Sequence, residues 1–507
     1  MTALGPVCIA TAANEVPGWD AEVIDENNCR RGSPPRDADG LPDHPALHEL
    51  RPADMVGLYG GLSSTVPRLY DVARAYKAMG VSTVAGGQHF VDETIEDALR
   101  SGIDVVVLGE GEATMPELLA WKDGRMNLAE VRGIVYLKDG AVVHTPAREP
   151  ILDFDALPLP DYSLVRHARI SIYPVGRVRG CVMSCEFCTV KGKPRYASPE
   201  RLAEQVVSLY ETFGADQFFI VDDLFGQDRE ETLRLCRMLR DSQRRLHKRF
   251  GFTVQIRLDK ARDTELLAAM REAGVQVAAI GFESPIAEEL RAMNKRLDPQ
   301  EMIELALLYR RAGFWVHGMF IFGYPMDKGV EFQMPAPERV RHFRRFIRRA
   351  RIDTVQVLLP VPLPGTELTR RLEAQGRIYS RDYVGWEYYD GNFPLFEPDS
   401  PMTAEQMQDS IRRIMGRFYH MRHMFGIAFH TVCFPAIVFH LHNLKAGWQG
   451  WLRRWRNNVM RFGGWLILRR WIAEFRKGTF SSKLTAAKRA IHDRQGARQD
   501  RPGALPL

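Results

Sequence analysis

The sequence predicts an α/β protein in three parts: a doubly wound N-terminal sheet, a second run of strands and helices, and a helical, basic C-terminal region. Short apolar segments alternate with amphipathic segments in the first part, and the alternation resumes after a proline-rich connector. The last part is rich in Trp and Arg and lacks strand signals. With 507 residues, 45% hydrophobic and 26% charged, the chain is long enough for about three domains, which excludes a small disulfide scaffold and a wholly disordered chain.

The N-terminal elements follow from apolar runs that end in glycine or another turn residue. Expected strands are Val7–Thr11, Ala21–Ile24, Met55–Tyr59, Ser82–Ala85 and Asp104–Leu108. Expected helices are Val66–Met79, Thr94–Ser101 and one beginning at Thr114. A small hairpin is expected within Val131–Glu149, because Asp139-Gly140 is a turn pair. Strands that alternate with helices indicate a parallel sheet.

A connector with Pro158, Pro160 and Pro174 marks the domain boundary. We therefore predict domains at 1–145, 176–396 and 397–507, with a linker at 146–175. The expected strands of the second domain are Gln217–Val221, Gly251–Ile256, Val277–Ile280, Val316–Phe322 and Thr354–Leu359.

The charge is unevenly placed along the chain. From Trp451 to Leu507 there are 14 Lys and Arg against three acidic residues, a net charge of +11, so the first 450 residues carry −5 of the total of +6. A basic, Trp-rich stretch is typical of a helix lying on a membrane surface. Two alternatives stay open: a helical subdomain packed on the barrel, and, less favoured, nucleic-acid binding. The residues from Ala486 on are expected to be disordered.

No apolar run is long enough to span a membrane. The nearest, Phe425 to Val438, is interrupted by His430 and Pro435. No leader peptide opens the chain, so we expect a cytoplasmic protein, with peripheral contact to the membrane face through the basic tail.

Three of the seven cysteines, Cys181, Cys185 and Cys188, fall within eight positions, and the other four are scattered. Three thiolates at this spacing can hold three corners of an iron–sulfur cube and leave one iron open to another ligand. A zinc site and a redox pair are the alternatives. A zinc site usually needs a second Cys or His pair, and none follows.

The pattern Cys-x-x-x-Cys-x-aromatic-Cys, with Phe187 as the aromatic, resembles that of the radical S-adenosylmethionine (SAM) enzymes. The resemblance implies a [4Fe–4S] cluster on Cys181, Cys185 and Cys188 whose open iron chelates SAM. It also implies cleavage of SAM to a 5′-deoxyadenosyl radical, a partial (β/α) barrel, and an electron donor such as flavodoxin or ferredoxin.

Polar residues at the ends of the following strands support the resemblance, because such strand ends form the site in (β/α) barrels. The candidate SAM-binding residues are Phe187, Asp222, Asp223, Gln255, Arg257, Glu283, Ser284 and Gly323. Helix capping by Asp223 or Ser284, and solvation of Arg257, are the structural alternatives.

Small and polar residues also follow three N-terminal strands, where a flat ligand could enter. These are Ser63, Ser64, Gly86, Gly87 and Glu110. Together with the radical SAM motif they resemble the cobalamin-binding domain of B12-dependent radical SAM enzymes. The Asp-x-His-x-x-Gly motif that supplies an axial His is absent, and His89 is expected to be a surface residue. A remnant domain that only shields the SAM site is the alternative.

The predicted function is cobalamin-dependent methylation of an unactivated carbon in a small-molecule or lipid-like substrate, in which SAM supplies both the methyl group and the radical. Two alternatives remain: radical SAM cyclisation or rearrangement without methyl transfer, and a non-catalytic cobalamin-binding or membrane-associated protein.

Overall fold

The computed structural model describes residues 1–30, 32–295, 297–327, 330, 332–432, 444–476 and 478–499. It divides into two compact units. The first comprises residues 1–184, 188–276 and 363–369, and the second comprises 185–187, 277–362 and 370–507. Each unit combines segments that are separate in the sequence, whereas the predicted domains are continuous ranges, so the domain boundaries stay a prediction.

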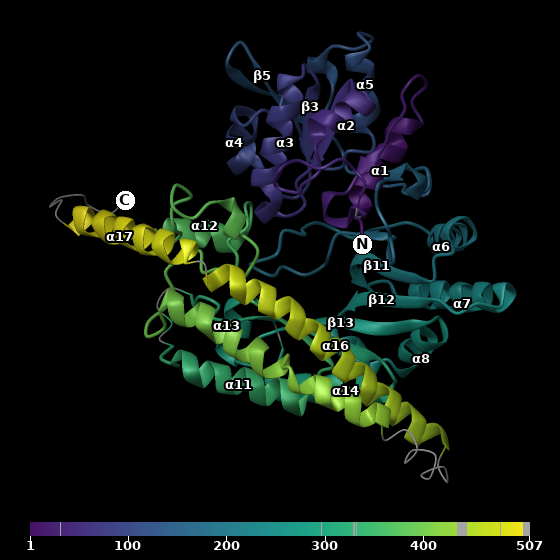
Figure 1. The fold of residues 1–507 in the computed structure, drawn as a ribbon, viewed down its shortest axis with the longest axis vertical. Coiled ribbons are helices and arrows are strands. Elements are labelled where there is room, and N and C mark those ends of the chain that lie inside the picture. The colour runs from purple at the N-terminus through teal and green to yellow at the C-terminus, as the bar shows by residue number, and fades with distance from the viewer. Residues whose placement is uncertain are drawn as a thin grey trace. The chain divides into compact units, whose positions relative to one another are not determined.

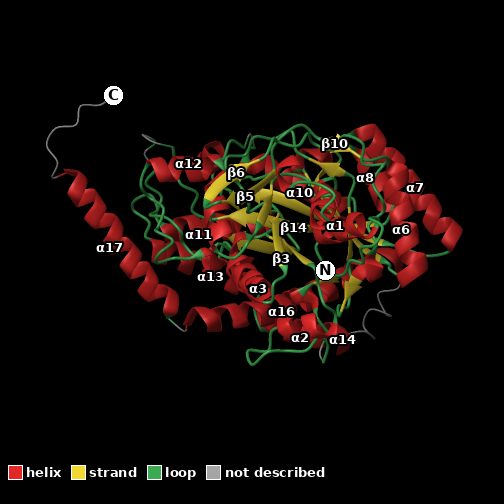
Figure 2. Ribbon diagram, turned by 90° about the horizontal axis from the view of Figure 1, so that it is seen from above, coloured by secondary structure: helices red, strands yellow, loops and turns green. Residues whose placement is uncertain are grey.

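The first unit contains a five-stranded sheet in the order β2-β3-β4-β5-β6. The first three strands are parallel, and β5 and β6 form the predicted antiparallel hairpin (Figure 2). The strands are β2 (Met55–Tyr59), β3 (Ser82–Gly86), β4 (Val105–Val107), β5 (Ile134–Lys138) and β6 (Ala141–His144). The helices around them are α2 (His44–Leu50), α3 (Val66–Ala78), α4 (Ile95–Arg100) and α5 (Thr114–Lys122).

The sheet is doubly wound because its two faces are covered by different helices. Ala85 and Val106 pack in one cluster with apolar residues of α3 and α4. Val84 and Val105 point to the other face and pack with Leu118 of α5. The predicted α/β class and doubly wound arrangement are confirmed.

The first residues depart from the prediction. Val7–Thr11 belongs to helix α1 (Leu4–Asn14) rather than to a strand. The expected strand Ala21–Ile24 is reduced to β1 (Val23–Ile24), which pairs with β7 (Val165–Arg166) and does not join the main sheet. An isolated apolar run of five residues has no period that separates strand from helix, so packing of α1 against α5 decides the outcome.

The second α/β run begins in the first unit with three parallel strands in the order β8-β11-β12. They are β8 (Tyr173–Val175), β11 (Gln217–Phe225) and β12 (Gly251–Ile256), and the short antiparallel pair β9 (Val178–Arg179) and β10 (Arg195–Tyr196) brackets the cysteine loop. The helices are α6 (Pro199–Phe213), α7 (Arg229–Leu246) and α8 (Thr264–Glu272), with α6 and α7 in contact (Figure 1).

The second unit continues the alternation with parallel strands in the order β13-β14-β15. The strands are β13 (Val275–Glu283), whose first two residues belong to the first unit, β14 (Trp315–Ile321) and β15 (Thr354–Leu358). The helices are α9 (Ala287–Ala292), α10 (Pro299–Arg311), α11 (Ala336–Arg349) and α12 (Glu367–Ala374), which begins in the first unit. Phe282, Phe320 and Phe346 form the aromatic core between these strands and α11.

The C-terminal region is helical, as predicted, and α11, α13, α14 and α16 lie against one another (Figure 1). Its helices are α13 (Ala404–Phe418), α14 (Arg422–Val432), α16 (Leu444–Arg476) and α17 (Thr479–Gln499). The expected disorder from Ala486 is wrong up to residue 499, because Ala487 and Ile491 of α17 are buried in an apolar cluster with Tyr379. Residues 500–507 lie outside the described part.

Helix α16 is hydrogen-bonded to Asp353, which directly precedes β15 and whose side chain is completely buried. Asp353 pairs with Arg310 at 2.5 Å and accepts a hydrogen bond from Asn457 of α16 at 2.9 Å. Arg461, one turn further along α16, donates to the carbonyl of Ile352 at 3.1 Å. Packing is therefore shown for part of the basic tail. Among the described helices, none is long and apolar enough to cross a membrane.

Candidate functional site

Two adjacent aspartates at the end of β11 hold the backbone that leads into the cysteine loop. Asp222 Oδ1 accepts hydrogen bonds from the amides of Arg177 at 2.6 Å and Val178 at 2.9 Å. Asp223 Oδ2 accepts from the Gly180 amide at 2.6 Å. The register between β11 and β12 breaks between Ile220 and Phe225, so both aspartates lie in an irregular strand end.

Asp222 has an unusual environment. Burial, which two backbone donors offset only in part, raises its pKa from 3.8 to about 6. Its second oxygen, Oδ2, is buried and has no hydrogen-bond partner among the described residues. Burial also raises the pKa of Asp223. The alternative of helix capping by Asp223 is wrong, because the next helix, α7, is capped by Asp228.

The three cysteines lie in one loop between β9 and β10. Gln227 anchors its start: its amide nitrogen donates to the Gly180 carbonyl at 3.0 Å, and its oxygen accepts from the Val182 amide at 3.2 Å. Cys185 is buried, and Cys181 and Cys188 are partly exposed. Burial, and then the nearby Cys181, raise the pKa of the Cys188 thiol.

Glu186, between the second and third cysteines, is the centre of a network in the second unit. It accepts hydrogen bonds from Tyr324 Oη at 2.6 Å and from Arg371 Nε at 2.5 Å and Nη2 at 2.9 Å. Phe187 packs edge-on against the Tyr324 ring, with 6.1 Å between the centroids. The aromatic position of the motif is thus part of the anchorage of the loop.

Glu283 ends β13 in a left-handed conformation with φ of 59°, where the register with β14 also shifts. A non-glycine residue in this region is strained and is found often at functional sites. Its carboxylate pairs with Lys295 at 2.6 Å. Ser284 is fully buried; it donates to Glu289 and accepts from the Ile286 amide at 3.1 Å. Ser284 thus bonds the amide of Ile286, the residue before α9, but no described side chain caps α9 itself, and the SAM role of Ser284 stays a prediction.

The three remaining predicted SAM-binding residues differ in their burial and in their contacts. Arg257 is paired with Asp259 at 2.7 Å rather than solvated, and its Nη1 lies 2.6 Å from the sulfur of Met183 in the cysteine loop. Gln255 lies half-buried on β12. Gly323 has φ of 77°, and a Cβ there would lie 2.9 Å from Met402, so a glycine is required at this turn.

At the N-terminal sheet, the loops after β2 and β3 come into direct contact. The Gly60 amide donates to the Gly86 carbonyl at 2.8 Å, and a Cβ on Gly87, which has φ of 117°, would lie 2.8 Å from the Gly60 backbone. Ser63 Oγ is hydrogen-bonded to His89 Nδ1 at 3.0 Å. His89 is only 2% exposed, so its expected surface position is wrong. Ser64, beside Ser63, is half-buried.

Glu110, in the loop after β4, is held by two arginines of the second α/β run. Arg179 Nη1 donates to it at 2.8 Å and Arg195 Nη1 at 2.7 Å, while the Ile151 amide donates at 2.8 Å. Burial would raise its pKa, but the hydrogen bonds from Arg195 and Arg179 outweigh burial and lower it. The structure gives Glu110 an ion-pairing role, and its contact with a cofactor stays a prediction.

Two family descriptions match this chain. The radical SAM superfamily matches residues 176–334, which include the cysteine loop and strands β11 to β14. The B12 binding domain matches residues 3–119, which include β2, β3 and β4. The chain thus contains a radical SAM domain and a B12 binding domain. The predicted enzyme class and the cofactor set of a [4Fe–4S] cluster, SAM and cobalamin are confirmed, and the alternative of a non-catalytic binding protein is not supported.

The names of similar proteins are consistent with these two family matches. An uncharacterised methyltransferase of Pyrococcus horikoshii is 29% identical over 71% of this chain and 78% of its own length. An anaerobic magnesium-protoporphyrin IX monomethyl ester cyclase of Cereibacter sphaeroides is 25% identical over 75% of this chain, which spans 62% of the cyclase. The solved structure of the radical SAM methyltransferase TsrM from Kitasatospora setae, with cobalamin and a [4Fe–4S] cluster, shares the fold (TM-score 0.59, 18% identity, 73% of this chain and 75% of that one).

The cysteine loop of the radical SAM protein fits a cluster better than a single ion. Among the described residues, no three His, Cys, Asp or Glu side chains gather as the ligands of one metal ion would. A tetrahedral zinc site needs all its ligands about 2.3 Å or less from one ion, whereas the cysteines of a cube bind different irons. The radical SAM match over this loop favours the cluster over the zinc alternative, and the all-thiol donor set is that of iron–sulfur clusters.

The N-terminal sheet of this radical SAM protein also fits a large flat ligand. The Gly60 and Gly87 backbones meet without side chains between them, at the carboxyl ends of parallel strands, where ligands bind in open α/β sheets. Among the described residues that follow β3, the imidazole of His89 is buried and hydrogen-bonded to Ser63. The donor set therefore agrees with a cobalamin bound without an axial histidine from the chain.

Two groups at the site were not predicted from the sequence. Glu186 and Arg371 are 185 positions apart, and nothing local marks their pairing. Arg179 and Arg195 flank the cysteine motif as paired residues of the short strands β9 and β10, and two arginines so placed could have indicated an acidic partner such as Glu110. A charged residue placed between two cluster cysteines was the signal that could have drawn attention to Glu186.

Proposed function

We propose that this protein catalyses cobalamin-dependent radical methylation of an unactivated carbon in a small-molecule or lipid-like substrate. The observation that supports it most is one cysteine loop, with three thiols and no fourth cysteine ligand, joined in the first unit to the loops of a B12 binding domain through Glu110. The named methyltransferase relative supports methyl transfer.

When bound, the cluster and SAM supply the radical and cobalamin carries the methyl group. The chain itself contributes position. Cys181, Cys185 and Cys188 would hold the cluster, and Asp222 and Asp223 fix the backbone that precedes them. The Oδ2 atom of Asp222, which has no partner among the described residues, supports a polar contact with SAM, and Gly60 and Gly87 allow the loops after β2 and β3 to pack closely at the sheet edge where cobalamin would bind.

The first test is cluster assembly. After anaerobic reconstitution, we expect about four irons per chain, as one cube requires, together with reductive cleavage of SAM to 5′-deoxyadenosine. Cys181→Ala should lose the cluster, as judged by its visible absorption and iron content. Cys29→Ala, which removes a thiol outside the motif, is the matched control and should keep the cluster. Equal loss in both variants would contradict the assignment of the three cysteines.

The second test is methyl transfer. We expect purified protein to retain cobalamin, seen in its absorption spectrum, and to form S-adenosylhomocysteine only when cobalamin is present. Methyl-labelled SAM should then label the product once a substrate is found. Cluster and SAM cleavage without any cobalamin retention would contradict methylation while leaving the radical SAM assignment intact.

Radical cyclisation or rearrangement without methyl transfer is the second candidate. The cyclase relative, which aligns with 75% of this chain, favours it. The two candidates differ in one readout: a cyclase of this kind would consume SAM to 5′-deoxyadenosine without forming S-adenosylhomocysteine.

A further inference from the structure

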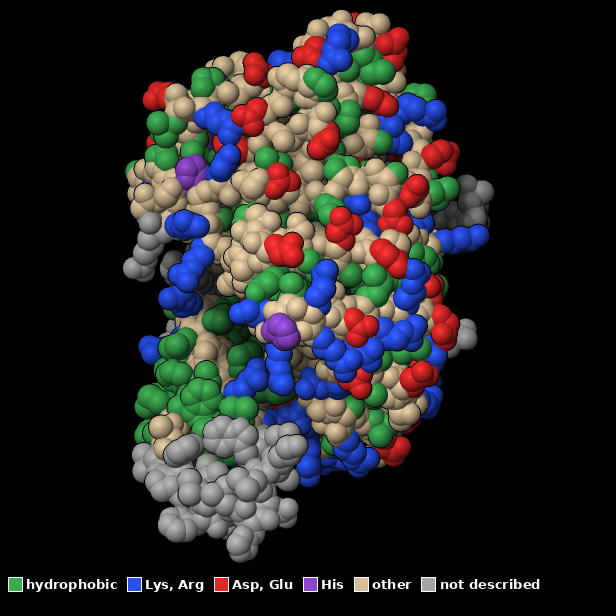
Figure 3. Space-filling model, turned by 90° about the vertical axis from the view of Figure 1, so that its right-hand side faces the viewer, with side chains coloured by type: hydrophobic (Ala, Val, Ile, Leu, Met, Phe, Trp, Pro, Cys, Tyr) green, Lys and Arg blue, Asp and Glu red, His purple; other side chains and the backbone are tan. Residues whose placement is uncertain are grey.

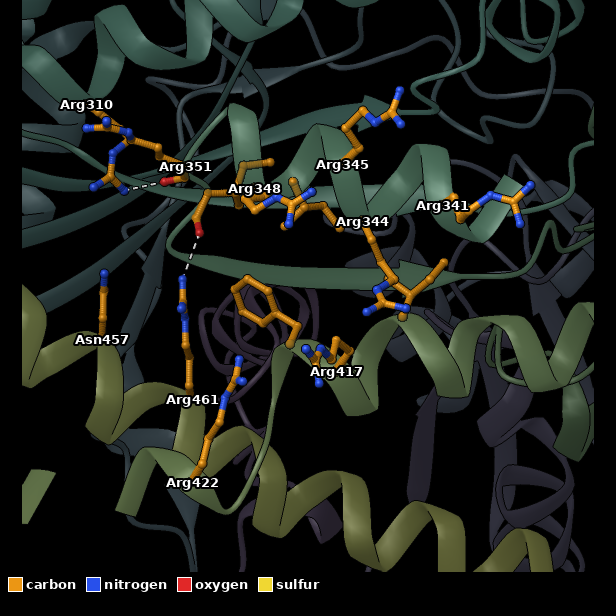
Figure 4. Close-up of a pocket in the computed structure, with 14 residues that line it drawn as sticks. Arg310, Arg341, Arg344, Arg345, Arg348, Arg351, Arg417, Arg422, Asn457 and Arg461 are labelled. Carbon is orange, nitrogen blue, oxygen red and sulfur yellow. Dashed lines mark hydrogen bonds between the residues drawn. The ribbon is translucent and has the colours of Figure 1, made fainter. Parts of the chain in front are cut away.

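A cavity of about 700 Å³ lies in the second unit between helices α11, α13, α14 and α16. Nine of its 14 lining residues are arginines, and none is an acid. The arginines are Arg310, Arg341, Arg344, Arg345, Arg348, Arg351, Arg417, Arg422 and Arg461. In Figure 4, Arg344 of α11 points toward the helices that bear Arg417 and Arg422.

Most of this positive charge is not balanced by the protein. Arg310 pairs with Asp353, and Arg461 donates to the Ile352 carbonyl. For the other seven arginines, no ion pair with a carboxylate is found among the described residues. Four of them, Arg341, Arg344, Arg345 and Arg348, lie on α11, and those three or four positions apart are neighbours on the helix surface, where like charges destabilise a helix. A bound polyanion would relieve this repulsion.

An apolar surface lies on the next helix. Met421 and Met424 are each 43% exposed, Phe425 is 63% exposed and Phe429 is 65% exposed. Met424, Phe425 and Phe429 lie on α14 and Met421 directly precedes it, and α14 packs against α16. Figure 3 shows apolar side chains gathered over this helix pair. Arg422, which lines the cavity, is the first residue of α14 and follows Met421 directly.

The combination of a cationic cavity and an exposed apolar helix face decides the class of partner. An amphipathic helix that lies in a membrane interface buries its apolar side chains at the headgroup boundary, and nearby arginines attract anionic lipid. A soluble phosphate compound would use the cavity but leave the apolar face exposed to water. Single-stranded nucleic acid would stack on aromatic rings, and two of the four exposed side chains are methionines.

We propose that this face of the second unit binds the surface of an anionic phospholipid membrane. Headgroup phosphates enter the arginine cavity, and Met421, Met424 and Phe425 insert beside it. The proposal does not depend on the reaction that the protein catalyses.

The test is flotation of the full-length protein with vesicles of phosphatidylcholine, alone or with phosphatidylglycerol. Wild type should float only with the anionic vesicles. Arg344→Gln with Arg348→Gln should weaken binding about 30-fold, as expected for two arginines at a lipid surface. Met421→Ser with Phe425→Ser should weaken it at least tenfold with the net charge unchanged. These side chains are exposed, so circular dichroism should show unchanged folding.

The matched control is Arg244→Gln with Arg291→Gln, which removes the same charge from side chains that are 71% and 74% exposed elsewhere. It should change binding less than twofold. Equal weakening by the control would overturn the site in favour of a net-charge effect. So would full displacement of vesicles by glycerol phosphate, which indicates a soluble phosphate site, or tighter binding of single-stranded RNA that is lost in the same variants. Failure of wild type to float with anionic vesicles would also overturn it.

Discussion

Arg179 donates a hydrogen bond to Glu110 at 2.8 Å, and it lies two residues before the first cysteine of the motif. The pair joins the loop after β4 of the B12 binding domain to the strand that opens the cysteine loop, within one compact unit. Arg179 also pairs with Glu112, and its guanidinium lies 4.8 Å from the centre of the Phe154 ring. This pair positions the two loops and takes no direct part in the reaction.

Glu110→Gln should destabilise the protein by about 2 kcal/mol, because charge-assisted hydrogen bonds become neutral ones and two arginines lose their counter-charge. Since the pKa of Glu110 is lowered in the folded state, its contribution should be lost as the pH falls below the ordinary carboxyl value of 4.5. Urea unfolding followed by circular dichroism measures both. Glu96→Gln, whose side chain is 69% exposed, should cost less than about 0.5 kcal/mol, and an equal loss in both would contradict the prediction.

Gly87→Ala should destabilise the N-terminal sheet and abolish cobalamin retention. The added Cβ would lie 2.8 Å from the Gly60 backbone, which cannot move away as a flexible side chain can. We expect a loss above about 2 kcal/mol. Gly80→Ala is the control, because its φ of 79° imposes left-handed strain but nothing lies within 4 Å of its Cβ. Similar losses in thermal unfolding for the two variants would show that strain alone, not the close approach, matters.

Asp222→Asn should change how stability depends on pH. The raised folded-state pKa means that the native protein binds this proton more tightly than the unfolded chain does. The group therefore costs nothing well below pH 3.8, and its cost grows as the pH rises to about 6, reaching about 3 kcal/mol above that. Because Asn stays neutral, the stability of the variant relative to wild type should rise by most of this amount between pH about 4 and about 7.

Urea titrations at both pH values test this, and comparison with wild type removes the effect of other groups. A difference between the two proteins that does not change with pH would contradict it.

Arg371→Gln should lower the yield of cluster reconstitution. It leaves Glu186, between two cluster cysteines, without its charged donor while Tyr324 still donates. A buried carboxylate without its partner is destabilising by about 3 kcal/mol or more, so we expect the loop to rearrange. Tyr324→Phe should act more mildly, since it removes one hydrogen bond. Arg291→Gln, at an exposed site on α9, is the control; iron content and visible absorption should be normal in it and reduced in Arg371→Gln.

The sequence predicts well where local pattern and tertiary structure agree. Asp222 and Asp223 could be placed near a strand end because they follow the apolar run up to Val221, although β11 continues past them to Phe225. The hairpin at Asp139-Gly140 forms because both residues take positive φ, at 52° and 80°.

Other features depend on partners far away in the chain. Residues 7–11 are apolar whether they form a helix or a strand, and contact with α5 makes them helical. His89 is polar, but Ser63, 26 positions before it, gives it a partner that allows burial. The same holds for the pairing of Glu186 with Arg371, which no local period signals.

The burial of Asp353 has a practical consequence for shortened versions of this enzyme. A chain cut after α14 would leave that buried carboxylate with only Arg310 and the Val316 amide as partners among the described residues, because the Asn457 bond to it and the Arg461 bond to the Ile352 carbonyl would be lost. The last helices are thus a structural part of the catalytic fold, and attempts to isolate a minimal radical SAM core by C-terminal deletion should yield insoluble protein.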